Sequence, residues 1–148
     1  MENPNFHFPQ TAENIAMIAN GTGIAPFLGM IQENILRKNI SLFAGFRHDN
    51  DWVNSYRIFA ENQINQGQLE HFDFAFSREE NKQYVMDLIR KNENYFAELL
   101  AKNGTIMICG SLKMQKDVEI ILDEICQKFL GKPLQHFIKN GQILADCY

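Results

Sequence analysis

The chain has 148 residues, which is enough for one domain with a substantial hydrophobic core. Its formal net charge of −4 supplies no global positive field, so we expect no nucleic-acid partner and a phosphate site only where cations gather locally. No apolar run approaches the ~20 residues of a membrane-spanning helix, so we expect no direct membrane insertion by this segment.

Cysteines and histidines are few and scattered. Cys109, Cys126 and Cys147 form no CxxC motif and cannot all pair, which favours a reducing compartment such as the cytoplasm over a disulfide framework. The four histidines lack the spacing of metal ligands, so we expect no metal site.

Short apolar runs alternate with longer amphipathic runs along the chain. The apolar runs predict five strands, at residues 14–20, 40–46, 69–76, 105–110 and within 141–148. The amphipathic runs predict four helices, at residues 26–38, 51–66, 83–102 and 113–130. This alternation predicts an α/β fold of three layers, in which helices flank a five-stranded parallel sheet.

Particular residues refine the helix predictions. Pro26 suits the first turn of the first helix, and one buried face there would be formed by Phe27, Met30, Ile31 and Ile35. Asn50 or Asp51 is a candidate cap for the second helix, and the third helix should break near residues 92–94.

Four loops should meet at one edge of this sheet, because ligands of parallel sheets bind beyond the carboxyl ends of the strands. They are residues 20–26, 47–51, 77–82 and 109–113. All four contain polar or small side chains, and this pattern favours a nucleotide cleft.

The first loop, "GTGIAP", would let backbone amides approach a pyrophosphate through Gly21 and Gly23, with the Thr22 hydroxyl beside them. The alternative is a purely structural turn. The loop is neither a P-loop, since no GK[ST] follows, nor a GxGxxG fingerprint, since Pro26 fills the third position. Arg47 follows the second strand, where a ribose-binding carboxylate would otherwise stand.

A cationic cluster follows the third strand, in "FSREENKQY". Ser77, Arg78 and Lys82 suit a terminal phosphomonoester such as the 2′-phosphate of NADPH, and Tyr84 would stack on a purine. The alternative is a solvated loop whose cations pair with the neighbouring glutamates.

Two further stretches lie near predicted strand ends. Cys109 would present a small polarisable side chain over the cleft, and the alternative is an inert buried thiol. Tyr148 follows the last strand directly, and an ordered terminal ring needs a flat partner. The alternative there is a frayed tail.

Together, "GTGIAPF", "AFSRE…K…YV", "CGS…M…DV" and the terminal "DCY" resemble the nucleotide-binding domain of ferredoxin–NADP reductase-like flavoenzymes. The likeness is to the diflavin branch, which includes sulfite reductase flavoprotein and cytochrome P450 reductase. It runs in order from about Ile15 to Tyr148. It implies that residues 1–148 are an NAD(P)H-binding domain and the C-terminal part of a larger flavin-containing reductase, since nothing in the chain resembles that family's flavin-binding barrel.

The resemblance also implies roles for residues. The implied cofactor-binding set is Gly21, Thr22, Gly23, Pro26, Arg47, Ser77, Arg78, Lys82, Tyr84, Cys109, Gly110, Ser111, Met114 and Tyr148. The implied catalytic residues are Cys109, near the hydride-carrying carbon, Asp146, which would assist the hydride step, and Tyr148, which would stack on the FAD ring system. Ser111 departs from the family pattern, in which an aspartate is usual.

The implied function is binding of NADPH and delivery of hydride to FAD on a separate domain, from which electrons pass to a downstream acceptor. The chain alone would then bind nucleotide without turnover, and its parent chain could be attached to a membrane or free of one. The alternatives are an NADH-preferring reductase of the same fold and a non-catalytic nucleotide-binding module, which would have no reason to keep Asp146 and Tyr148. A flavodoxin-like signalling domain is disfavoured, because no acidic cluster follows the first strand.

Overall fold

Five parallel strands form the centre of the structure, which is a computed structural model describing residues 6–148. They are β1 Asn14–Asn20, β2 Asn39–Phe46, β3 His71–Phe76, β4 Thr105–Gly110 and β5 Ile143–Cys147. Their order in the sheet is β3-β2-β1-β4-β5, and every neighbouring pair is parallel. The chain moves outward from β1 in both directions, so the strand order reverses between β1 and β4. This is the topological switch point at which open α/β sheets bind ligands.

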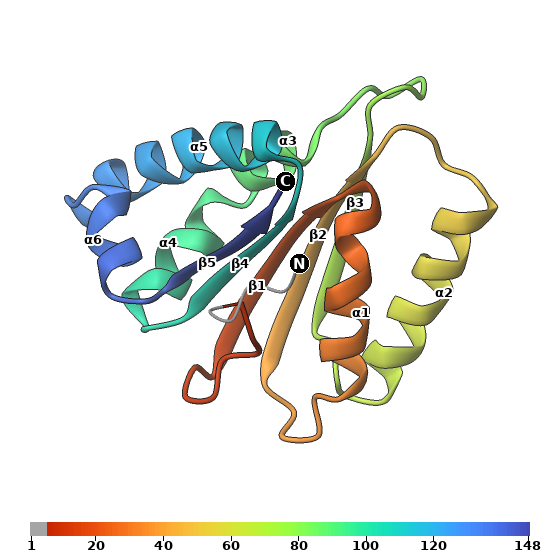
Figure 1. The fold of residues 1–148 in the computed structure, drawn as a ribbon, viewed down its shortest axis with the longest axis horizontal. Coiled ribbons are helices and arrows are strands. Elements are labelled where there is room, and N and C mark those ends of the chain that lie inside the picture. Colours follow the sequence, from red (N-terminus) through yellow and green to blue (C-terminus); the bar gives the residue numbers. More distant parts are fainter. Residues whose placement is uncertain (1–5) are drawn as a thin grey trace.

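Helices cover both faces of the sheet (Figure 1). One face is covered by α1 Ala25–Gln32, which follows a short 3₁₀ helix at Gly21–Ile24, and by α2 Asp51–Asn65. The other face is covered by α3 Val85–Lys91, α4 Glu93–Ala101, α5 Leu112–Leu130 and α6 Leu134–Lys139. The predicted three-layer α/β fold with a five-stranded parallel sheet is therefore confirmed.

The hydrophobic core consists of two clusters, one on each face of the sheet. Alternate residues of β1 supply both clusters: Ile18 packs toward the layer of α3, α4 and α5, and Met17 packs toward the layer of α1. Because both faces are covered, the strand is apolar from Ile15 to Ala19, as expected for a parallel sheet. Phe43 on β2 packs its ring 5.1 Å from that of Phe96 on α4, and burying one such side chain contributes about 1.5–3 kcal/mol.

The predicted first helix is wrong at its C-terminal end. It was expected to reach residue 38, but α1 ends at Gln32, and Ile35, expected on its buried face, is 81% exposed. The buried Asn34 side chain closes a turn here, since it accepts from the Lys38 backbone N–H at 3.0 Å and donates to the Lys38 carbonyl at 2.9 Å. Arg37 has a positive φ of 54°, which ends helical geometry.

The other elements follow the predictions closely. Asn50 caps α2, since its side-chain oxygen accepts the Val53 N–H at 3.0 Å, and the predicted third helix breaks at Asn92 into α3 and α4. The short helix α6 and the 3₁₀ helix before α1 were not predicted, and β3 begins at His71 instead of residue 69. Within residues 6–148, no helix is both long and apolar enough to cross a membrane.

Candidate functional site

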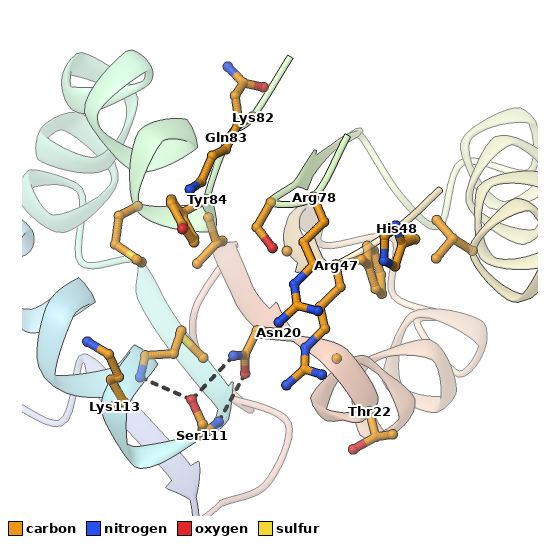
Figure 2. Close-up of a pocket in the computed structure, with 18 of the residues that line it drawn as sticks. Asn20, Thr22, Arg47, His48, Arg78, Lys82, Gln83, Tyr84, Ser111 and Lys113 are labelled. Carbon is orange, nitrogen blue, oxygen red and sulfur yellow. Dashed lines mark hydrogen bonds between the residues drawn. The ribbon is translucent and has the colours of Figure 1, made fainter. Parts of the chain in front are cut away.

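A cleft of about 1410 Å³ opens at the carboxyl edge of the sheet (Figure 2). Its walls come from the segments that follow β1, β2, β3 and β4, so the four predicted loops meet in one place. The cleft is larger than the roughly 300–1,000 Å³ of a typical small-molecule pocket and has room for an extended dinucleotide.

The cleft brings together most of the residues singled out from the sequence. Those lining it are Gly21, Thr22, Arg47, Ser77, Arg78, Lys82, Tyr84, Ser111 and Met114. Those outside its lining are Gly23, Pro26, Cys109, Gly110, Asp146 and Tyr148. The phosphate-binding candidates therefore form one group, and the candidates for the hydride step form a second group along β4 and β5.

The two loop glycines after β1 have different roles. Gly21 has a positive φ of 54°, and nothing lies within 4 Å of the place where a Cβ would stand, so its backbone is open to a ligand. A Cβ on Gly23 would overlap the carbonyl oxygen of Cys109, so this glycine lets the loop pack directly against β4. Pro26 occupies the first turn of α1, where its missing N–H costs nothing.

Arg47 and Arg78 form the cationic part of the cleft, and Figure 2 shows both side chains reaching into it. Their backbones are held together, because the Arg78 N–H donates to the Arg47 carbonyl at 2.9 Å and the Ser77 N–H donates to the Phe46 carbonyl at 2.9 Å. Within residues 6–148, neither guanidinium group forms an ion pair. Two unpaired guanidinium groups on one wall suit an anionic ligand.

The neighbouring glutamate does not neutralise Arg78. One carboxylate oxygen of Glu79 instead accepts the Asp49 backbone N–H at 3.0 Å and lies 3.3 Å from Nδ1 of His48. Glu79 therefore does not pair with a cation of its own loop, as the alternative of a solvated loop would have it.

Lys82 and Tyr84 form the outer wall of the cleft. The Lys82 ammonium lies 5.5 Å from the centre of the Tyr84 ring, and Tyr84 is 45% exposed. The Tyr84 backbone N–H donates to the Asp87 carboxylate at 2.8 Å, which fixes the start of α3. An exposed ring beside a cation suits stacking on a nucleobase near a phosphate.

Asn20 is the main site residue that sequence reasoning missed. Its side-chain oxygen accepts the Ser111 N–H at 3.0 Å, and its amide nitrogen donates to the Ser111 hydroxyl at 3.3 Å. That hydroxyl also accepts the Met114 N–H at 3.1 Å and so caps α5. A Cβ on Gly110 would overlap the Asn20 side-chain oxygen, so a glycine is needed there. The Ser111 hydroxyl thus accepts two hydrogen bonds, and its own proton remains available to donate.

Other lining residues also went unassigned, among them His48, Lys113, Trp52 and Asp117. His48 and Lys113 lie inside two of the loops that were predicted to form the cleft, so their place in the sequence could have identified them. Trp52, which is 74% exposed, lies in the first turn of α2, and Asp117, which pairs with Lys113 at 3.2 Å, lies in the second turn of α5. Only the three-dimensional arrangement brings these two to the cleft.

The second group lies along β4 and β5. Cys109 is 1% exposed and pairs in register with Asp146, which is half-buried. Burial, together with the nearby Cys147 and Asp146, raises the pKa of the Cys109 thiol to about 11, so it stays protonated near neutral pH. The Tyr148 N–H donates to the Gly110 carbonyl at 3.0 Å, while the residue is 74% exposed. The last backbone amide is thus held against β4, and the ring is left open.

Comparison with known proteins gives a consistent result. Residues 17–119 match the family described as the oxidoreductase NAD-binding domain. The chain is 35% identical over 130 residues to a sulfite reductase (NADPH) flavoprotein alpha-component of Mannheimia succiniciproducens. It is 36% identical over 132 residues to a sulfite reductase (NADPH) flavoprotein alpha-component of Neisseria meningitidis. Each of these alignments covers 83% of this chain and 21% of the relative. It is 35% identical over 138 residues to an NADPH–cytochrome P450 reductase of Salmo trutta, covering 85% of this chain and 23% of the relative.

The chain therefore spans about a fifth of the length of the curated relatives it matches. The predicted resemblance to the diflavin reductases is confirmed by these matches. From the matched segment and the parallel sheet with its cleft at the switch point, we conclude that the chain belongs to the oxidoreductase NAD-binding domain family.

Proposed function

We propose that the chain binds NADPH in this cleft and presents its nicotinamide to FAD held by a separate domain. The observation that carries the proposal is the pair of unpaired guanidinium groups, Arg47 and Arg78, on one wall of the cleft in an NAD-binding domain. The chain is acidic overall, yet it places two unpaired cations together in the cleft. This local positive charge suits a ligand with phosphates.

The phosphate end of the cofactor is assigned to the first group. The open backbone at Gly21 and the Arg47 guanidinium receive the pyrophosphate. Ser77, Arg78 and Lys82 receive the 2′-phosphate that distinguishes NADPH from NADH. Tyr84 provides the exposed ring for the adenine.

The nicotinamide end is assigned to the residues near the switch point. When bound, the cofactor supplies a hydride, and the residues of this chain supply orientation and electrostatics. Ser111 donates its free hydroxyl proton, and the neutral Cys109 thiol keeps a small, uncharged group beneath the site. Asp146 assists the step from the neighbouring strand, and the exposed Tyr148 ring stacks on the FAD ring system.

The partner implied by this arrangement is an FAD-binding domain, which the parent chain would supply, followed by a downstream electron acceptor. The relatives whose names include NADPH support this assignment. We propose a cytoplasmic location on the basis of the cysteine pattern.

Calorimetric titration of the 148-residue chain with 2′,5′-ADP, and in parallel with 5′-AMP, tests the proposal. Tight binding of 2′,5′-ADP and weak binding of 5′-AMP are expected, because only the former carries the phosphate that Ser77 and Arg78 would read. Equal affinity for both would refute NADPH selectivity and favour an NADH-preferring domain. Absence of binding by either nucleotide would refute the proposed site.

A further inference from the structure

We propose that Glu79 is a positioning residue for phosphate recognition, and this inference rests on the proposed function. Glu79 links the loop after β3 to the loop after β2, and these two loops carry Arg78 and Arg47. Its carboxylate thereby restrains the two loops from which the guanidinium groups reach into the cleft.

The geometry of the link is specific. Glu79 follows Arg78 in the chain, while its two partners, His48 and Asp49, follow Arg47. One oxygen atom receives both contacts, at 3.0 Å from the Asp49 backbone nitrogen and 3.3 Å from Nδ1 of His48. A carboxylate only accepts, so the proton of this contact belongs to Nδ1 of His48. The link thus joins Glu79, directly after Arg78, to the two residues that follow Arg47.

The backbone contact is the important one. An exposed ion pair such as His48–Glu79, whose side chains are 54% and 41% exposed, adds little by itself. A backbone N–H that donates to a carboxylate forms a stronger, charge-assisted bond and needs no ordering of a second side chain. The Asp49–Glu79 bond therefore restrains the backbone of the loop that bears Arg47.

The remaining side chains of that loop are also occupied. The Asp49 carboxylate pairs with Arg57 of α2 at 3.2 Å, and the Asn50 side chain caps α2. Among residues 47–50, the Arg47 guanidinium is the side-chain group that forms no hydrogen bond or ion pair within the described part of the chain. The loop is thus anchored on both sides, and its one uncommitted cation faces the cleft.

An effect of the Glu79 charge and a positioning role of Glu79 predict opposite changes in nucleotide affinity when this residue is replaced. A carboxylate near an anion site repels the anion, so its removal would tighten binding if charge alone mattered. If Glu79 instead positions the loops, its removal costs affinity, because the loops must then be ordered when the ligand binds. Glu80 is a matched control, since it has the same charge in the same loop, is exposed, and has no hydrogen bond or ion pair to any residue from 6 to 148.

The experiment measures the affinity of the full chain for 2′,5′-ADP by calorimetry, with Glu79→Ala, Glu79→Gln and Glu80→Ala as variants. Glu79→Ala should weaken binding by roughly threefold to tenfold, the range expected for loss of one hydrogen bond. Glu79→Gln keeps an acceptor oxygen for the Asp49 N–H and should retain much of the affinity. Glu80→Ala should leave the affinity unchanged or slightly higher.

A second measurement separates positioning from general damage. Amide hydrogen exchange should be faster at residues 47–50 and 77–82 in Glu79→Ala alone, with the rest of the sheet unchanged. If Glu79→Ala binds 2′,5′-ADP as tightly as Glu80→Ala does, the positioning role is overturned while the proposed function stands. If the unsubstituted chain shows no preference for 2′,5′-ADP over 5′-AMP, the proposed function fails and this inference fails with it.

Discussion

The Asn20 side chain forms two hydrogen bonds with Ser111, and these bonds bridge β1 and the start of α5 at the switch point of the sheet. One bond satisfies the Ser111 backbone N–H, and the other orients the hydroxyl that caps α5. The pair therefore fixes the floor of the cleft and the first turn of the helix beside it.

Asn20→Ala should lower the free energy of unfolding by about 1–3 kcal/mol, because it leaves a part-buried N–H without its partner. Asn14→Ala is the matched control, since Asn14 begins the same strand and forms only an exposed side-chain bond with Asn39. That variant should change stability by less than about 0.5 kcal/mol. Denaturant unfolding measures both, and equal losses would contradict the role given to Asn20.

Arg78→Ala should weaken binding of 2′,5′-ADP by roughly 1.5–3 kcal/mol, the range for a hydrogen bond to a charged group, and should hardly affect 5′-AMP. Arg90→Ala provides the control for net charge, because Arg90 is paired with Glu124 at 3.1 Å on the outer surface of α3 and lies outside the cleft lining. Calorimetry on both variants decides the point. A similar loss of affinity for both nucleotides would show that Arg78 does not contact the 2′-phosphate.

Gly23→Ala should destabilise the chain by about 1–3 kcal/mol, because the new Cβ would overlap the Cys109 carbonyl and push the loop away from β4. Gly29→Ala is the matched control within α1, where nothing lies within 4 Å of the added Cβ. It should stabilise the chain by about 0.5–1 kcal/mol through helix propensity. Thermal unfolding of the two variants should therefore shift in opposite directions, and a shift in the same direction would refute the close packing at Gly23.

The fold should lose stability as the pH rises from about 9 to about 11. Burial raises the pKa of the Cys109 and Cys126 thiols from 9.0 to about 11, so the native chain holds these protons more tightly than the unfolded chain. Their contribution is complete below pH 9 and disappears as the pH passes the folded pKa. Denaturant unfolding across this range should show the decline.

A Cys109→Ala, Cys126→Ala double variant should show a shallower decline between about pH 9 and pH 10. Tyr95, whose pKa is raised mainly by burial, contributes in the same direction at higher pH and is left unchanged by the variant. A decline as steep as that of the unsubstituted chain would show that the Cys109 and Cys126 thiols are not responsible.

The sheet and its helices were predictable because the spacing of apolar residues along the sequence distinguishes strands from helices. The end of α1 was not, because Asn34 closes its turn partly through the Gln68 carbonyl, a bond to a residue far along the chain. Residues 35 and 36 continue an apolar pattern but lie in this turn, where they are exposed. The helix α6 has only six residues, which is too short for a periodic signal.

The site was predictable in the same partial way. Loops after parallel strands meet at one edge, so Arg47 and Arg78 could be brought together from topology alone. The Asn20–Ser111 bonds and the Glu79 link depend on side-chain geometry between loops, and a sequence does not specify which polar group another will choose. The same geometry reveals that Cys109 is buried and neutral.

The unpaired state of Arg47 and Arg78 has a consequence for the solution behaviour of the chain. Without carboxylate partners among residues 6–148, the two cations are open to anions of the buffer, with which a bound nucleotide would compete. The net charge of −4 alone would make added salt favour an anionic ligand by screening repulsion. Arg47 and Arg78 act in the opposite sense and at shorter range, so the affinity for a nucleotide should fall as the ionic strength rises. In its response to salt, this acidic protein should therefore resemble a basic one.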